Sequence, residues 1–301
     1  MTTILPRMLR RLVKRLALVL CASAVLAPCA HAQGVRALTY NIRLDTAADG
    51  PNAWPHRRQA MASLISFYAP DVMGMQEVLA HQRQQLAEDL PDYVFVSFGR
   101  DDGAEAGESS PLAFRRVRFS LSESGVFWLS PTPESPSMGW DAAYRRIVTW
   151  ARLTERGSGA HVLALSTHWD HVGRSARAHS GDMVRRWIAQ NRRPCETVIL
   201  LGDLNAHPDE ASYRNLTSAR GPLRDTIALS ATPPFGPVGT FNGFDIARAE
   251  PGPIDYILVS DGVDVTRHGV ITQHEGGRLP SDHYPVLADL SLPKQSCGAA
   301  R

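Results

Sequence analysis

The stretch TVILLGDLN, residues 197–205, decides the fold of this 301-residue chain. Its first five residues are aliphatic or β-branched without interruption, which is typical of a strand buried on both faces. Gly202 ends the apolar run, and Asp203 and Asn205 follow it. The sequence therefore predicts a carboxylate and an amide at the carboxyl end of a core strand, next to a loop, where binding residues commonly lie.

Similar runs recur along the chain, rich in Val, Ile and aromatic residues: Val35–Ile42, Val72–Gln76, Tyr93–Phe98, Leu112–Phe114, Val126–Leu129, Ile147–Leu153, His161–Thr167, Ile254–Val259, Asp264–Ile271 and Tyr284–Leu290. Helical spacing of apolar residues is clear only at 61–68, 79–90 and 183–188. Most strand connections are too short for a helical crossover. We therefore expect an α/β fold of one domain, with two mixed or largely antiparallel sheets packed face to face and helices outside.

Polar side chains occupy the ends of the predicted strands: Asn41, Glu77, His168, Asp203 and Asn205 lie at the carboxyl end of an apolar strand, and Asp255 and His283 lie at the start of one. In antiparallel neighbours, the end of one strand lies beside the beginning of the next. All of these groups can therefore share one rim.

The carboxylates and the amide in this set suit phosphate hydrolysis assisted by a metal. A hard cation such as Mg²⁺ binds carboxylate oxygens together with substrate phosphate, and Glu77 can supply the principal ligand. Asp203 and Asn205 can orient a water molecule and a phosphoryl oxygen.

The histidines extend the same chemistry. His283 can act as a general base, or stabilise the transition state, if Asp255 holds its other ring nitrogen. Asn41 and His168 can donate hydrogen bonds to the charge that develops. Each residue alone also has an ordinary structural explanation, such as a turn or a cap. Their joint occurrence favours the catalytic interpretation.

Six motifs stand in a recognisable order: LTYNIR (38–43), MQE (75–77), STHWDH (166–171), LGDLN (201–205), IDYI (254–257) and SDHYPV (281–286). This ordered set resembles the endonuclease/exonuclease/phosphatase superfamily, which has the deoxyribonuclease-I-like fold. The resemblance covers essentially the entire chain after its N-terminal segment. It implies a four-layer α/β sandwich, two packed mixed sheets flanked by helices, and a hydrolase that acts on phosphoric esters.

The resemblance also implies residue roles: metal and phosphate binding by Asn41 and Glu77, support of the metal or its waters by Asp282, positioning of water and phosphate by Asp203 and Asn205, and orientation of His283 by Asp255. The implied cofactor is Mg²⁺, with Mn²⁺ as a substitute. Members of this family are assigned different general bases, so Asp203 and His283 both stay candidates. Whether one or two metal ions act stays open.

Further substrate-binding candidates flank these motifs. Arg146 lies just before the strand Ile147–Leu153 and could bind a phosphate bidentately, although a surface salt bridge explains it equally well. Asp170, His171 and Arg177 extend the motif around residue 168, as either a cleft signature or a packed loop network. Three polar or Pro/Gly-rich loops are expected to form the cleft rims: 101–110, 130–141 and 230–253.

Residues 1–32 have the order of a secretory signal peptide. A basic segment from Arg7 to Arg15 precedes the apolar run Leu16–Leu26, and small residues end at Ala32. The run is too short for a membrane anchor, which needs about 20 apolar residues. We expect cleavage after Ala32, export to the periplasm or the medium, no transmembrane anchor, and a catalytic domain of residues 33–301.

Removing that segment changes the charge. The chain has 32 basic and 30 acidic residues, and residues 1–32 hold five basic and no acidic ones, which leaves 27 against 30, a net −3. The basic surplus that would hint at nucleic acid thus belongs to the signal peptide. We expect a monomer for which nucleic acid is a possible but unfavoured partner. Cys195 and Cys297 either pair as a disulfide or stay free thiols.

The identity of the phosphoester stays open at this point. A phosphodiesterase or phosphomonoesterase for smaller esters, a nuclease for DNA or RNA, and a sphingomyelinase-like lipid phosphodiesterase all fit these residues. A noncatalytic phosphate-binding protein on this fold would typically lack a metal carboxylate or the final histidine. This chain keeps Glu77, Asp203 and His283, so we expect an enzyme.

Overall fold

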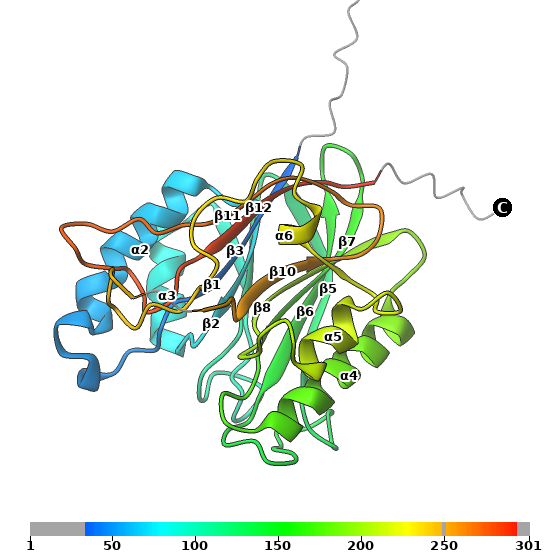
Figure 1. The fold of residues 1–301 in the computed structure, drawn as a ribbon, viewed down its shortest axis with the longest axis horizontal. Coiled ribbons are helices and arrows are strands. Elements are labelled where there is room, and N and C mark those ends of the chain that lie inside the picture. Colours follow the sequence, from blue (N-terminus) through cyan, green and yellow to red (C-terminus); the bar gives the residue numbers. More distant parts are fainter. Residues whose placement is uncertain (1–33, 249–250, 294–301) are drawn as a thin grey trace, which may run out of the picture. The chain divides into compact units, whose positions relative to one another are not determined.

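The computed structural model describes residues 34–248 and 251–293, which contain two six-stranded sheets (Figure 1). The first sheet has the strand order β11-β12-β1-β2-β4-β3. Its strands are β1 (Val35–Asn41), β2 (Val72–Gln76), β3 (Tyr93–Val96), β4 (Leu112–Arg115), β11 (Asp264–Val270) and β12 (Val286–Ser291). The β1–β2 pair is parallel and the other pairs are antiparallel, so the sheet is mixed.

The second sheet has the order β5-β6-β7-β8-β10-β9. Its strands are β5 (Phe119–Trp128), β6 (Ile147–Glu155), β7 (His161–His168), β8 (Glu196–Asp203), β9 (Arg224–Asp225) and β10 (Asp255–Val259). Here the β7–β8 pair is parallel and the other pairs are antiparallel.

Helices cover the outer faces of both sheets (Figure 1). On the first sheet these are α2 (Trp54–Tyr68) and α3 (Ala80–Asp89), and on the second α4 (Arg174–Asn191) and α5 (Ala211–Thr217). Two short elements, η1 (Ala47–Asn52) and α6 (Thr226–Leu229), complete the described helices. The layers are therefore helix, sheet, sheet and helix, which confirms the predicted fold class.

Strand β8 shows why the deciding stretch is apolar throughout. Ile199 and Leu201 point into the core between the two sheets, whereas Val198 and Leu200 pack in the cluster that holds α4. All four side chains are fully buried. A strand with helices on one face and a second sheet on the other has no solvated face, so its sequence cannot alternate between apolar and polar residues.

Strand register brings polar residues to one end of the second sheet. Asp203 pairs with His168 across the parallel β7–β8 ladder and with Asp255 across the antiparallel β8–β10 ladder. In the first sheet, Asn41 at the end of β1 pairs with Gln76, the residue before Glu77. The rim predicted from the sequence is thus a product of register in both sheets.

Some elements differ from the sequence-based expectation. Strand β5 begins at Phe119, seven residues before the predicted Val126. The sequence did not reveal this first half because most of it is exposed and a register shift near Leu121 breaks the alternation of side chains. Helix α4 begins well before its apolar stretch, because its first turns bury small or polar residues such as Ala176 and Ser180. The short elements η1, α5, α6 and β9 carry too little periodicity to be predicted.

No helix within residues 34–248 and 251–293 is long and apolar enough to cross a membrane. The predicted signal peptide, residues 1–32, lies outside the described residues.

Candidate active site

Asn41 joins the polar ends of the two sheets. Its buried amide nitrogen donates to Glu77 Oε1 and to Asp203 Oδ2, both at 3.0 Å. Its Oδ1 accepts from the backbone N–H of Arg43 at 3.0 Å. Both polar atoms of Asn41 are therefore engaged by the protein, and the side chain orients two carboxylates from different sheets.

Three residues of the site have left-handed backbone conformations. The φ angles are 58° at Arg43, 61° at Glu77 and 46° at Asn205. Such angles are uncommon for residues other than glycine and persist only where the surroundings hold them. Each follows the end of a strand by one or two residues, so the chain turns sharply and points these side chains across the sheet ends.

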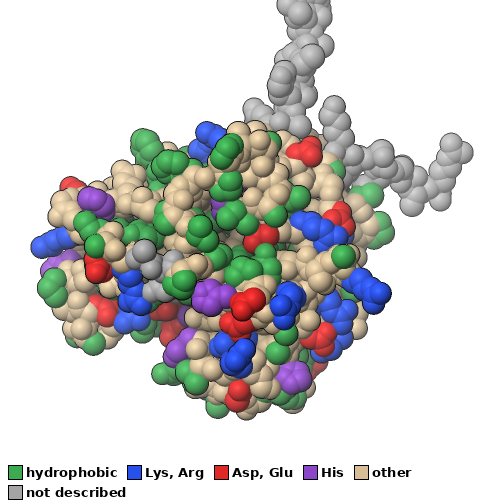
Figure 2. All heavy atoms as spheres, in the orientation of Figure 1, with side chains coloured by type: hydrophobic (Ala, Val, Ile, Leu, Met, Phe, Trp, Pro, Cys, Tyr) green, Lys and Arg blue, Asp and Glu red, His purple; other side chains and the backbone are tan. Residues whose placement is uncertain are grey.

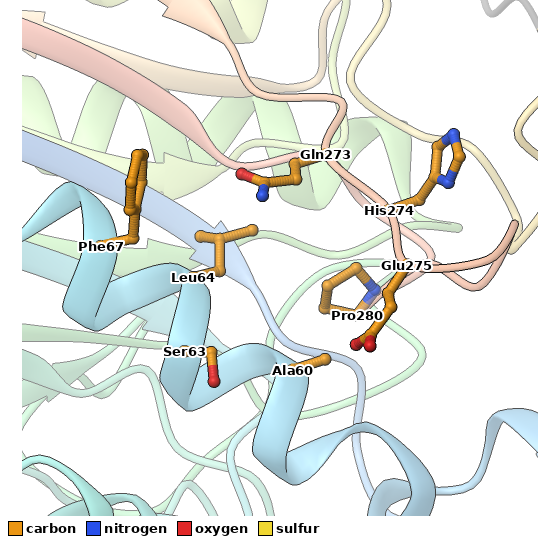
Figure 3. Close-up of a pocket in the computed structure, with 8 residues that line it drawn as sticks. All are labelled: Ala60, Ser63, Leu64, Phe67, Gln273, His274, Glu275 and Pro280. Atoms are coloured by element: carbon orange, nitrogen blue, oxygen red, sulfur yellow. The ribbon is translucent and has the colours of Figure 1, made fainter.

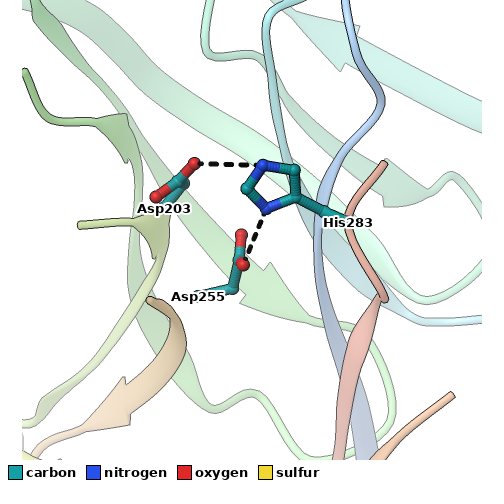
Figure 4. A group of neighbouring side chains, drawn as sticks. All are labelled: Asp203, Asp255 and His283. Atoms are coloured by element: carbon teal, nitrogen blue, oxygen red, sulfur yellow. Dashed lines mark hydrogen bonds and ion pairs between the residues drawn. The ribbon is translucent and has the colours of Figure 1, made fainter. Parts of the chain in front are cut away.

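His283 lies between two aspartates (Figure 4). Its Nδ1 is 2.9 Å from Asp255 Oδ2, and its Nε2 is 3.9 Å from Asp203 Oδ2. Thr240 Oγ1 also donates to Asp255 Oδ2, at 2.6 Å. Asp255 accepts both bonds, so Nδ1 of the imidazole carries a proton and the Nε2 edge faces Asp203.

Electrostatics reinforce this arrangement. Burial alone would lower the pKa of His283 by disfavouring the charged imidazole. The negative charges of the nearby carboxylates, Asp255 first, have the larger combined effect and raise the pKa to about 10. Burial, and then repulsion by Asp255, raises the pKa of Asp203 to about 7. The trio therefore concentrates acidic and basic groups, two of which, Asp203 and His283, line the cleft.

His168 and Asn205 fix each other on the neighbouring strand end. Asn205 Nδ2 donates to the carbonyl of Trp169 at 3.0 Å, which sets the orientation of the amide. Its second N–H meets His168 Nε2 at 3.0 Å, so that nitrogen accepts and the ring proton sits on Nδ1. Burial, and then the charge of Arg146, holds the pKa of His168 well below its usual range. Asn205 Oδ1 stays free for a ligand.

The donor set fits a hard divalent cation. Glu77, Asp203, Asp282 and Asn205 all line one cleft, and their oxygens are the ligand type that Mg²⁺ prefers. Burial, with the charge of Glu77 adding to it, raises the pKa of Asp282. Crowded, buried acids of this kind lack sufficient positive charge, and a bound cation would supply it.

A second grouping of possible ligand atoms exists. Among the described residues, Asp203, Asp255 and His283 form a group whose ligand atoms lie within 4.8 Å of one another. A metal bound to all three would have to displace the hydrogen bond between His283 Nδ1 and Asp255. The carboxylates around Glu77 need no such change, and we therefore favour them as the cation site.

The cleft has a volume of about 660 Å³. Besides the acids, the cleft is lined by a wall of basic and aromatic side chains: Arg100, Tyr144, Arg146 and His171. Arg100 lies over the Tyr144 ring, 5.0 Å from its centroid, and His171 stacks on the same ring at 5.8 Å. Of the predicted substrate-binding residues, Arg146 and His171 thus line the cleft.

Asp170 and Arg177 lie behind that wall. Asp170 is buried, and its Oδ1 accepts from the backbone N–H groups of Val172 and Gly173 while Oδ2 accepts from those of Ala143 and Tyr144. Arg177 donates to the Asp170 carbonyl and to Glu210. Neither lines the cleft, and their bonds hold the wall in place.

Several cleft residues escaped the sequence reasoning: Arg43, Arg100, Glu108, Tyr144 and Phe241. Loop position was the available signal, because Glu108 and Phe241 belong to two loops predicted as rims and Tyr144 follows the third. A second, apolar pocket of about 250 Å³ lies between α2 and residues 273–280 and shares no residue with the cleft (Figure 3).

Cys195 is disulfide-bonded. Its predicted partner, Cys297, lies outside the described residues.

Comparison with known proteins gives consistent matches. The model of the Endonuclease/Exonuclease/phosphatase family matches residues 38–283. The structure is similar to an endonuclease/exonuclease/phosphatase family protein from Bacteroides thetaiotaomicron, with 33% identity and a TM-score of 0.82 over 85% of this chain and 97% of that one. It is equally similar to the mannosyl-6-phosphatase of Bacteroides thetaiotaomicron, with 33% identity and a TM-score of 0.80 over 85% and 99%.

More distant matches agree in fold. The catalytic domain of human Nocturnin with bound sulfate is 21% identical, with a TM-score of 0.66 over 86% of this chain and 93% of that one. An uncharacterised protein of Acanthamoeba polyphaga mimivirus is 27% identical over 159 residues, which span 50% of this chain and 59% of that relative.

Proposed function

The chain belongs to the Endonuclease/Exonuclease/phosphatase family, and on that basis we propose that it is a divalent-metal-dependent hydrolase of phosphoric esters. The single observation that carries this proposal is the hydrogen bonding of Asn41, which ties Glu77 of one sheet to Asp203 of the other at the floor of a cleft. Acid, amide and imidazole groups from six strand ends meet there.

The residues divide the chemistry between them. Glu77, Asp203, Asp282 and the Asn205 amide oxygen would hold Mg²⁺ or Mn²⁺, and the bound cation supplies positive charge to the phosphoryl oxygens and lowers the pKa of water. Asn41 orients the first two carboxylates.

The attacking water needs a proton acceptor at the same place. Asp203 faces His283 there and takes the proton as water attacks phosphorus. The raised pKa of His283 keeps its imidazole protonated, so this ring stabilises the negative charge that develops. Asp255 fixes the His283 ring, and His168 fixes the Asn205 amide.

The charge distribution favours small phosphoesters over a nucleic-acid chain. On the face seen in Figure 2, acidic and basic side chains of the described residues are interspersed, without a continuous basic strip that could follow a polyphosphate backbone. The similar mannosyl-6-phosphatase is named for a sugar phosphate. We therefore place small phosphomonoesters ahead of DNA, RNA and lipid phosphodiesters.

A metal-supplemented screen tests the activity. The panel contains p-nitrophenyl phosphate, bis-p-nitrophenyl phosphate, sugar phosphates, inositol phosphates, sphingomyelin, DNA and RNA, each with Mg²⁺, with Mn²⁺ and with EDTA. We expect EDTA-sensitive hydrolysis that Glu77→Gln lowers by at least about 100-fold. If no phosphoester is turned over, or if Glu77→Gln and wild type are equally active, the proposal fails.

Export is part of the same proposal. Residues 1–32 carry the signal-peptide pattern, and we propose that the enzyme acts outside the cytoplasm as a monomer. Cell fractionation with N-terminal sequencing of the product tests cleavage after Ala32, and light scattering tests the mass. Retention of an uncleaved chain in the cytoplasm would contradict export.

A further inference from the structure

A small hollow opens beside the catalytic cleft, among Arg100, Glu108, Arg146 and His168. Its volume is about 10 Å³, which is room for about one oxygen atom. The same four residues also line the larger cleft. An oxygen in the hollow can therefore belong to a ligand whose remaining atoms lie in the cleft.

Arg146 contributes an unpartnered donor to this hollow. The side chain is 5% exposed. Its Nε lies 3.5 Å from Asp170 Oδ2, and its Nη2 lies 3.2 Å from His171 Nδ1. Its Nη1 is buried and forms no hydrogen bond with any residue of the described ranges 34–248 and 251–293. A buried guanidinium N–H without an acceptor destabilises the folded state, so a ligand that brings an acceptor to this atom would bind favourably.

His168 contributes a second unpartnered donor. The Asn205 amide occupies its Nε2, which leaves the ring proton on Nδ1. Nδ1 is also buried, and no residue that the structure describes forms a hydrogen bond with it. Two side chains that line the hollow and come from different strand ends thus each carry an N–H group without an acceptor.

Glu108 contributes the opposite function, an acceptor. Its Oε2 is paired with Arg100 Nη1 at 2.8 Å, and its side chain is only 15% exposed. Its Oε1 has no hydrogen-bond donor among the described residues, so that oxygen can accept a bond from a ligand. The hollow therefore combines two free donors with one free acceptor.

We propose that this hollow is a hydroxyl-binding subsite and that the substrate is the phosphate monoester of a polyol, such as a sugar phosphate. A hydroxyl oxygen accepts from the N–H groups of Arg146 and His168 while its proton is donated to Glu108. An ionised phosphate oxygen has no proton to donate, and the carboxylate repels it. The inference rests on the proposed phosphoester hydrolase activity and adds the group that the phosphate is attached to.

Glu108→Gln tests the subsite. The substitution keeps the size of the side chain and removes the charge that strengthens the hydrogen bond from the hydroxyl. Hexose 6-phosphates and glycerol phosphate are compared with p-nitrophenyl phosphate, whose leaving group carries no aliphatic hydroxyl. We expect kcat/KM for the polyol phosphates to fall about 10- to 100-fold, and to fall at least about 10-fold further than kcat/KM for p-nitrophenyl phosphate.

A matched control comes from the same loop. Glu105 pairs with Arg83 outside the cleft, and its side chain is 73% exposed. Glu105→Gln should therefore leave both kinds of substrate unaffected. A deoxy analogue of the best hexose 6-phosphate, lacking the recognised hydroxyl, should be a poor substrate for wild type and lose little more with Glu108→Gln.

Each outcome decides the matter. An equal loss on polyol and aryl phosphates would mean that Glu108 acts on the phosphate end, and no loss on either would mean that the hollow holds only water; both overturn the subsite. If wild type hydrolyses nothing, the proposed activity fails, but calorimetric titration with hexose 6-phosphates still measures whether the subsite binds them. Binding that is equal for wild type and Glu108→Gln would then refute it.

Discussion

Asp170 offers the sharpest test of how the cleft wall is held. Its two carboxylate oxygens accept four backbone N–H groups, two from residues 143 and 144 of the wall and two from residues 172 and 173. These backbone bonds, acting against burial, lower the pKa of Asp170. Asp170→Asn keeps the shape of the side chain but replaces one oxygen by an amide that cannot accept.

The magnitude follows from that count. The single oxygen of the introduced Asn side chain can still accept one pair of these backbone N–H groups. The other pair loses its charged acceptor, because the amide NH₂ group that replaces this oxygen can only donate. Hydrogen bonds to charged groups contribute about 1.5–3 kcal/mol each, so two of them at the lower end amount to about 3 kcal/mol. In a domain of this size each kcal/mol shifts Tm by about 2–4 °C. We expect Tm to fall by about 6–12 °C.

The substitution Asp170→Asn should also affect substrate binding more than the catalytic step. The wall carries Tyr144 and Arg146, and none of the proposed cation ligands belongs to it. Asp170→Asn should therefore raise KM several-fold for the best substrate while kcat stays within about 3-fold. Thermal melts followed by circular dichroism and steady-state kinetics supply both measurements.

A matched control sharpens the comparison. Asp102 also accepts two backbone N–H groups, those of Ala104 and Ala106, but on an exposed turn and with a single oxygen, Oδ1, which Asn retains. Asp102→Asn should therefore leave Tm within about 2 °C of wild type. A Tm for Asp170→Asn within about 2 °C of wild type would refute the reasoning. So would a loss confined to kcat, because the residue would then act on the chemistry and not on the wall.

Three further predictions concern charge. Asp255→Asn should lower kcat about 10²- to 10⁴-fold with an unchanged circular-dichroism spectrum, because His283 loses its fixed partner; activity near wild type would contradict that role. Mg²⁺ should raise Tm in wild type and not in Glu77→Gln, and equal shifts in both would argue against the proposed cation site. Burial lowers the pKa of His268 from 6.5 to about 4 in the folded protein. The unfolded chain therefore binds this proton more tightly, and the free energy of unfolding decreases by up to about 3 kcal/mol as the pH falls from about 6.5 to 4. His268→Asn keeps a donor toward Thr226 and should remove this part of the pH dependence of the free energy of unfolding, measured by urea unfolding at pH 7, 5.5 and 4.5. The same pH dependence in the variant and in wild type would contradict the prediction.

Much of the fold followed from local pattern. The buried strand at 197–205 and the polar residues after it were readable because a strand enclosed on both faces is apolar throughout. The position of Asn41, Glu77 and Asp203 at strand ends was readable for the same reason. The order of strands within each sheet was not, because pairing depends on contacts between residues far apart in the sequence.

The cleft wall was the least predictable part. Arg100, Glu108 and Tyr144 come from irregular loops whose course depends on distant groups, such as the Asp170 carboxylate and the Trp128 indole that donates to the Arg100 carbonyl. No local pattern encodes those bonds. Asp170 itself was noticed through its motif, but only the structure distinguishes a residue that supports the wall from one that touches a ligand.

The arrangement of the acids links catalysis to stability. Asn41 holds Glu77 and Asp203 side by side, although two carboxylates brought together repel each other. In the described structure, two cations lie near this charge: Arg43, 3.8 Å from both Glu77 and Asp282, and His283, 3.9 Å from Asp203. Each already binds another carboxylate at 2.9 Å, Arg43 that of Asp49 and His283 that of Asp255. The compensation is therefore incomplete, and a divalent cation that relieves it stabilises the folded state as it binds. The same negative charge that would attract the proposed cation thus lowers the stability of the protein without it, and a Mg²⁺-dependent rise in Tm would report how strongly the bound cation offsets this.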